Sequence, residues 1–143
     1  MPKTGFRIVL PATTLALAAM TGAVSAQDVP NLVGTWSGTI TGGARFGSLT
    51  HDPAEKDPVF ADRTKEWLLT IEKQDGSGLI GTWGRDARTE KLVGAIRRDN
   101  VTVVLADEDN IFDGRLLSAT EMELCGLEAG NATIAVCFLM MRK

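Results

Sequence analysis

The chain has 143 residues, and 44% of them are hydrophobic, which is enough for the core of one small domain. Acidic residues (18) outnumber basic ones (15), which argues against nucleic acid or an anionic membrane surface as a partner. One histidine and two cysteines do not supply the ligands of a structural zinc site.

Residues 1–26 are typical of a cleaved export signal. A basic start at Lys3 and Arg7 is followed by an apolar run, and residues 24–26 (Val-Ser-Ala) are the small residues that a signal peptidase reads. The run is too short and too interrupted by Thr and Pro for a membrane span, although a retained N-terminal anchor is the alternative. We therefore predict a periplasmic or secreted domain of residues 27–143, with no lipid-anchoring cysteine and no membrane insertion. Its net charge is about −5, because Lys3 and Arg7 leave with the signal.

Turn-forming residues recur at short, even intervals after this leader. The stretches between them alternate apolar and polar residues or are rich in β-branched residues, and no long 3.6-residue periodicity is present. Eight stretches are predicted as strands: 33–42, 65–74, 78–84, 91–97, 101–106, 110–117, 120–127 and 132–142. Short connections favour pairing between sequence neighbours. The prediction is therefore an all-β, eight-stranded antiparallel up-and-down β-barrel, a meander that closes on itself.

One long connection, about residues 43–64, has no strand pattern of its own. It contains His51, several aspartates and two prolines, which is typical of a solvated loop. A metal site or a general base built on His51 with Asp52, Asp57 and Asp62 is the alternative. Because rigid scaffolds often present recognition residues on long loops, this segment is also a candidate for protein contact.

Alternation along the strands predicts a dry interior and a wet exterior. In the stretch NLVGTWSGTI (residues 31–40), Trp36 points inward together with Gly34 and Gly38. Inward glycines give a closed sheet room to bend and accept bulky side chains from across the barrel. The residues predicted to line a ligand or to fill the core are Trp36, Trp67, Trp83, Phe112 and Phe138.

Cys125 and Cys137 are predicted to form a disulfide, because an even cysteine count in an exported chain favours one. Two free buried thiols are the alternative. If the cysteines face each other across the last hairpin, every inward pair of that hairpin is apolar. These pairs are Met122 with Met140, Leu124 with Phe138, and Gly126 with Val136.

The sequence supplies no catalytic set. A triad would need His51 as its base, but no serine lies in a G-x-S-x-G elbow. The acidic turn at residues 107–110 lacks the spacing of a calcium loop. The outward carboxylates Asp113, Glu121 and Glu123 do not flank a cleft as a glycosidase pair does. No catalytic, metal-binding or cofactor-binding residue is predicted, and an enzyme is the least favoured class.

The first strand resembles that of the calycins, the lipocalin and avidin type of barrel. Gly34-x-Trp36 follows a stretch able to form a short 3₁₀ turn, and Arg142 is placed like the basic residue that covers this Trp in lipocalins. The resemblance implies a closed barrel with Arg142 over Trp36. It does not imply biotin binding, because the chain has no Tyr and an apolar interior offers a polar ligand few partners.

Two functional classes follow. The favoured one is a non-catalytic barrel that binds a small apolar ligand, and a dry cavity above about 300 Å³ would support it. The alternative is a protein-interaction or inhibitor-type envelope accessory protein that uses the 43–64 segment, and a filled barrel would support that. An outer apolar patch of Val93, Val104, Leu139 and Met141 is a further candidate for partner contact, and the oligomeric state is left open.

Overall fold

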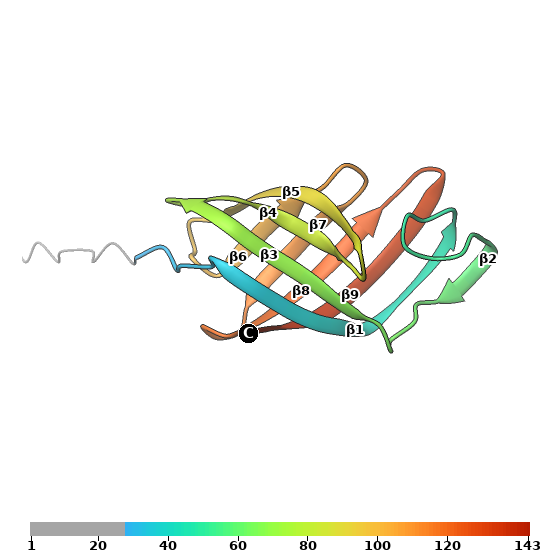
Figure 1. The fold of residues 1–143 in the computed structure, drawn as a ribbon, viewed down its shortest axis with the longest axis horizontal. Coiled ribbons are helices and arrows are strands. Elements are labelled where there is room, and N and C mark those ends of the chain that lie inside the picture. The colour runs from blue at the N-terminus through green and yellow to red at the C-terminus, as the bar shows by residue number, and fades with distance from the viewer. Residues whose placement is uncertain (1–27) are drawn as a thin grey trace, which may run out of the picture.

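The computed structural model describes residues 28–143, so the predicted signal and its cleavage point lie outside the described residues. This part of the chain contains nine strands and no helix, and the strands form one antiparallel sheet that closes between β1 and β9 (Figure 1). The strands are β1 Gly34–Gly47, β2 Glu55–Phe60, β3 Glu66–Asp75, β4 Gly78–Arg85, β5 Arg88–Ile96, β6 Thr102–Ala106, β7 Ile111–Leu116, β8 Glu121–Glu128 and β9 Ala132–Arg142. Within residues 28–143, no helix has the length and apolar character to cross a membrane.

All strands except β2 form an eight-stranded up-and-down barrel, which confirms the predicted fold class. Each strand pairs with its sequence neighbour, and β9 returns to β1. Short turns leave each strand little choice of partner, which is why a local pattern was sufficient to predict the topology.

The prediction of a structureless segment at 43–64 is wrong. β1 runs on to Gly47, and β2 pairs with this second half of β1, whereas the first half pairs with β3. A register shift between Ile40 and Gly42 lies just after β1 separates from β3, and the second half of β1 stays paired with β9 (Figure 1). β2 has the sequence EKDPVF, and its charged residues and Pro58 give no strand pattern. It is an edge strand that pairs only with β1, which is a position where proline is tolerated. Only residues 48–54 between these strands are irregular.

The interior is built from the side chains that the alternation placed inward. Trp36, Leu69, Leu124 and Met140 have no solvent exposure, and the remaining predicted inward apolar side chains are buried or half-buried. All five residues predicted as core or ligand lining are buried. Burial of this apolar surface is the main favourable contribution to folding.

Inward glycines are needed for two kinds of close contact, one with a bulky side chain and one with the backbone of a neighbouring strand. A Cβ on Gly126 would lie 2.8 Å from the Phe112 ring, so this glycine accepts a bulky neighbour as predicted. A Cβ on Gly38 would lie 2.0 Å from the Leu139 carbonyl oxygen, which is backbone and cannot move aside. Gly38 therefore allows β1 and β9 to approach each other at the closure of the barrel.

Cys125 and Cys137 form a disulfide with their Cα atoms 4.0 Å apart. They are direct partners of β8 and β9, and the three inward pairs of this hairpin are those expected from the sequence. The predicted disulfide and its register are confirmed.

Candidate functional site

One end of the barrel is closed by Trp36 and Arg142. The Trp36 indole donates a hydrogen bond of 3.1 Å to the Leu32 carbonyl, and the Arg142 guanidinium lies 5.5 Å from the centre of the ring. Arg142 also donates to the carbonyls of Asn31 and Val33, at 3.1 and 2.6 Å. The contact expected from Gly34-x-Trp36 is present, and it fixes the chain before β1 to the end of β9.

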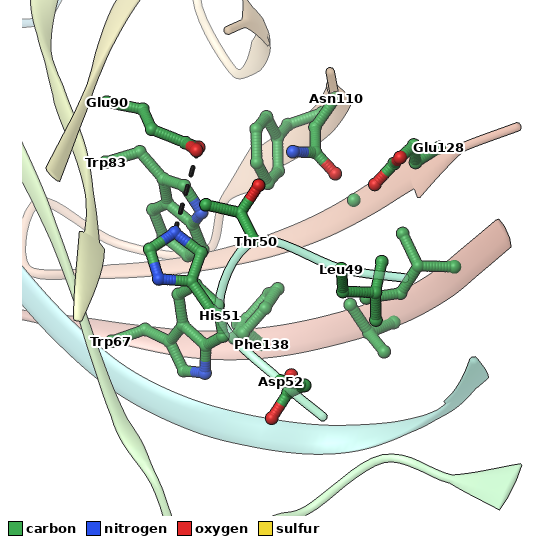
Figure 2. A pocket seen from close by; sticks show the side chains of 14 residues that line it. Leu49, Thr50, His51, Asp52, Trp67, Trp83, Glu90, Asn110, Glu128 and Phe138 are labelled. Atoms are coloured by element: carbon green, nitrogen blue, oxygen red, sulfur yellow. Dashed lines mark ion pairs between the residues drawn. The ribbon is translucent and has the colours of Figure 1, made fainter. Parts of the chain in front are cut away.

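The opposite end, the barrel mouth, is covered by residues 48–54, which we call the mouth loop. Beneath the loop lies a recess with a volume of about 40 Å³. Its lining, in part shown in Figure 2, is Leu49, Thr50, His51, Asp52, Trp67, Trp83, Glu90, Asn110, Phe112, Gly126, Glu128, Ile134, Val136 and Phe138. Such a volume suits a few water molecules, whereas pockets for larger ligands measure about 300–1,000 Å³.

Aromatic side chains fill the space below the mouth. The rings of Trp67 and Trp83 stack with centroids 5.1 Å apart, and Phe138 packs edge-on against both, at 5.6 and 5.1 Å. Phe112 contacts Trp83 at 5.0 Å. Four of the five predicted lining residues therefore meet at the mouth, whereas Trp36 lies at the closed end.

Three arginines hold the mouth loop, mostly through its backbone. Arg85 donates to the His51 carbonyl and, at 2.8 Å, to the Asp52 carboxylate. Arg88 donates to the Thr50 carbonyl at 2.6 Å, and Arg45 donates to the Pro53 carbonyl at 2.9 Å. Arg45 and Arg85 are both buried, so their charge-assisted hydrogen bonds are partly shielded from solvent, whereas that of Arg88 is exposed. Alternation from Trp36 would place Arg45 on the outer face, and only the register shift between Ile40 and Gly42 turns it inward, so the sequence did not reveal its position.

His51 points from the mouth loop into the recess. Its ring meets Trp67 edge-on at 5.1 Å, and its Nε2 lies 3.8 Å from a Glu90 carboxylate oxygen, as the dashed line in Figure 2 marks. Burial, and then the charges of Arg85 and Arg88, lower the pKa of His51 below 6.5. The imidazole is therefore neutral at pH 7, and the ion pair with Glu90 forms only on protonation.

The other wall of the recess is acidic. Burial raises the pKa of Glu90 above 4.5, and the nearby carboxylates of Asp107 and Asp109 raise it further. The pKa of Glu128 is raised by burial and by Asp109. Burial is the larger cause of both shifts, and repulsion among the carboxylates adds to it. Among residues 28–143, no group of three or more His, Cys, Asp or Glu side chains could hold a metal ion.

Three polar atoms at the mouth are buried and have no hydrogen-bond partner. They are Arg45 Nε, His51 Nε2 and Trp67 Nε1. Trp67 is only 6% exposed, so its indole N–H group has little access to bulk water. Buried polar groups are normally paired, so each of these atoms requires an explanation.

The outer face of the barrel carries a continuous series of apolar side chains, which we call the apolar row. Each member is the direct cross-strand partner of the next. In order from β4 to β2, the members are Ile80, Val93, Ala106, Ile111, Leu127, Ala135, Ala44 and Phe60. The large members on β4, β5, β7 and β8 are 53–61% exposed, and Phe60 is 88% exposed. The row ends at Lys73 of β3, the partner of Ile80.

The surface next to the apolar row is also poor in charge. The adjacent row holds Ala95, Val104, Asp113 and the Cys125–Cys137 disulfide, with one charged residue among them. Of the predicted outer patch, Val93 lies in the apolar row and Val104 lies beside it. Leu139 and Met141 instead face Glu123 and Glu121 across β8. The sequence identified part of this surface but missed Phe60, because the sequence of β2 has no strand pattern.

Fold and site together define a closed antiparallel β-barrel with a covered mouth and an apolar outer row. Comparison of the chain with protein-family models, curated proteins and solved structures gives no match.

Proposed function

We propose that the protein is a non-catalytic, exported β-barrel that binds a protein partner through the apolar row. The row itself carries the proposal. A soluble barrel whose interior is already apolar gains nothing from large apolar side chains on its outer face, and contiguous exposed apolar surface is typical of interaction sites. Export is supported by the leader sequence and is compatible with the disulfide.

The filled interior favours this function over storage of a small apolar ligand in the barrel. A recess of about 40 Å³ leaves no room for a ligand of ordinary size, and the stacked Trp67 and Trp83 occupy the space that such a ligand would need. The calycin resemblance supports the barrel architecture, but it does not imply a ligand for this chain.

The 43–64 segment contributes to the proposed surface through a strand and not through a free loop. Its mouth loop is folded inward and held by arginines, whereas β2 presents Phe60 at the end of the apolar row. The acidic turn Asp107–Asp109 lies between Ala106 and Ile111 of the row. The partner is therefore expected to be a protein with an apolar patch and basic residues at its border. An inhibitor and an envelope accessory factor both fit this description.

The test is recovery of the exported protein from its own host, followed by native mass spectrometry. A co-purified protein should be lost when Val93→Lys and Leu127→Lys are introduced together, because two ammonium groups would be buried in the interface. Thr39→Lys, an exposed change on β1 outside the row, is the matched control and should retain the partner. Isolation of the protein without any partner, or equal recovery with both variants, contradicts the proposal.

A further inference from the structure

We propose that the barrel mouth is a binding site for a small aromatic amine, and that the His51 side chain is an internal occupant which such an amine displaces. The site lies at the end of the barrel, and the proposal does not depend on the protein partner of the apolar row.

His51 sits as a bound ligand would sit. It is the only histidine in the chain, it comes from a loop and not from a barrel strand, and its side chain is 9% exposed. One edge of its ring meets Trp67, and one nitrogen is directed toward Glu90 (Figure 2). An aromatic ring with a basic nitrogen is therefore the chemistry that this recess already accommodates.

The imidazole makes an incomplete set of polar contacts in this position. Its Nε2 has no hydrogen bond, since the Glu90 carboxylate is 3.8 Å away. Departure of the ring therefore breaks no hydrogen bond at this atom. The mouth loop is held through the carbonyls of Thr50, His51 and Pro53 and through Asp52, so the His51 side chain is separate from these anchors.

An amine would satisfy the acidic wall better than His51 does. Glu90 and Glu128 line the recess, and their raised pKa values are caused by burial and by neighbouring carboxylates. A neutral imidazole brings no positive charge to these carboxylates, whereas an ammonium group keeps its charge at pH 7 and forms charge-assisted hydrogen bonds with them. Arg85 and Arg88, whose charges lower the pKa of His51, oppose a cation at the position of the ring, so the ammonium group is expected at Glu90 and Glu128. The Trp67 N–H has no acceptor, and an ammonium group, which only donates, leaves it unpaired.

The aromatic lining and the small volume of the recess favour a ligand with a single aromatic ring. Trp83, Phe112 and Phe138 present ring faces and edges below His51, and aromatic pairs prefer such offset and edge-on arrangements. Displacement of one imidazole, added to the recess of about 40 Å³, provides space for a single ring. Larger fused rings would need to move the mouth loop and to break its contacts with the arginines.

Three probes of matched shape test the proposal: benzylamine (cationic), benzyl alcohol (neutral) and benzoate (anionic). Affinity is measured at pH 7 by calorimetry, and the Trp67 indole N–H signal in NMR reports the location. The His51→Ala variant, which lacks the internal occupant, should bind benzylamine at least tenfold more tightly than the natural protein does. It should also prefer benzylamine to both other probes. His51→Phe, which fills the recess, should bind none of the three.

The acidic wall is tested separately. In the His51→Ala background, Glu90→Gln should weaken benzylamine binding about tenfold and leave benzyl alcohol unchanged, because only the cation needs the carboxylate. Glu123→Gln on the outer face is the control and should change neither. The proposal is overturned if His51→Ala does not prefer the cation, if it binds benzylamine no more tightly than the natural protein, or if Glu90→Gln has no effect.

If His51→Ala does not fold, a second experiment tests the site. The natural protein and the single variants Glu90→Gln and Glu123→Gln are each titrated with benzylamine, with the Trp67 indole signal as the readout. Weaker binding in Glu90→Gln alone supports the site, and equal affinity in all three proteins overturns it.

Discussion

Arg142 and Trp36 are direct partners across β9 and β1, and the guanidinium of Arg142 lies 5.5 Å from the centre of the Trp36 ring. The same guanidinium donates to the carbonyls of Asn31 and Val33, while the indole donates to that of Leu32. The two side chains therefore join the chain before β1 to the strand that closes the barrel. This relationship links the first and last strands of the described fold.

Trp36→Ala should cost about 3–5 kcal/mol of the free energy of unfolding, because a fully buried side chain leaves a cavity at the closed end. Arg142→Ala should cost less, about 0.5–2 kcal/mol, since it removes a cation over a ring and its hydrogen bonds at a half-exposed site. Urea denaturation of the two variants measures both values. Equal losses, or an unchanged free energy for Trp36→Ala, would contradict this account of the closed end.

Reduction of the Cys125–Cys137 disulfide should destabilise the domain by about 3 kcal/mol, because the bond limits the unfolded chain. A domain of this size should then melt several degrees lower. Thermal unfolding with and without reductant measures the shift. The double variant Cys125→Ser and Cys137→Ser is the control for side effects of reductant and should melt at the temperature of the reduced protein.

Gly38→Ala and Gly42→Ala should differ sharply although both change a glycine of β1. A methyl group on Gly38 would meet the Leu139 carbonyl oxygen at 2.0 Å, so β1 and β9 must separate, at a cost of about 1–3 kcal/mol. A methyl group on Gly42 would meet nothing within 4 Å, and this residue does not have a positive φ. Chemical denaturation should therefore show Gly42→Ala within about 0.5 kcal/mol of the natural protein. Similar losses in both variants would argue against backbone contact as the cause.

Asp52→Asn should loosen the mouth loop. The carboxylate accepts a hydrogen bond of 2.8 Å from the buried Arg85, and loss of its charge should cost about 1.5–3 kcal/mol. Amide hydrogen exchange of residues 48–54 should accelerate in the variant.

Asp86→Asn is the matched control, because Asp86 lies 3.9 Å from the same arginine but is 87% exposed. Exposed ion pairs contribute little, and asparagine tolerates the φ of 53° at this position. Exchange in the mouth loop should be unchanged by it. Faster exchange in Asp86→Asn than in Asp52→Asn would contradict the assignment of Asp52 as the anchor.

Asp99 should contribute an acid-sensitive part of the stability. Hydrogen bonds from the Thr102 hydroxyl and from the backbone N–H groups of Thr102 and Val101 lower the pKa of Asp99 from 3.8 to about 2. Because the folded pKa is below the unfolded one, this contribution is fully present above about pH 4 and is lost as pH falls through about 2. Carboxyl NMR titration should place the midpoint near 2. A midpoint near 4 would show that the turn does not hold the charged form.

Asp99→Asn separates this contribution from those of the other carboxylates. The difference in melting temperature between the natural protein and the variant should shrink as the pH is lowered from 4 to 2. A difference that stays constant over this range would mean that the turn, and not the charge of Asp99, sets the effect.

The sequence by itself determined the strands of the barrel, their order, the inward faces and the disulfide. These features depend on local patterns: period-two alternation fixes which face is buried, and short turns fix which strands pair. The Cys125–Cys137 register followed because a slip by one residue would have turned every side chain of that hairpin to the other face.

Only the tertiary structure decided the path of the 43–64 segment and the content of the barrel. β2 has a weak local pattern. It forms because β3 pairs only with the first half of β1, so the second half has an unpaired edge that β2 can join. The mouth loop turns inward because three arginines supply its hydrogen bonds: Arg45 at the end of β1, and Arg85 and Arg88, which are more than 30 residues away in the sequence. The apolar row likewise joins residues of eight strands, and such neighbours are set by cross-strand register and not by spacing along the chain.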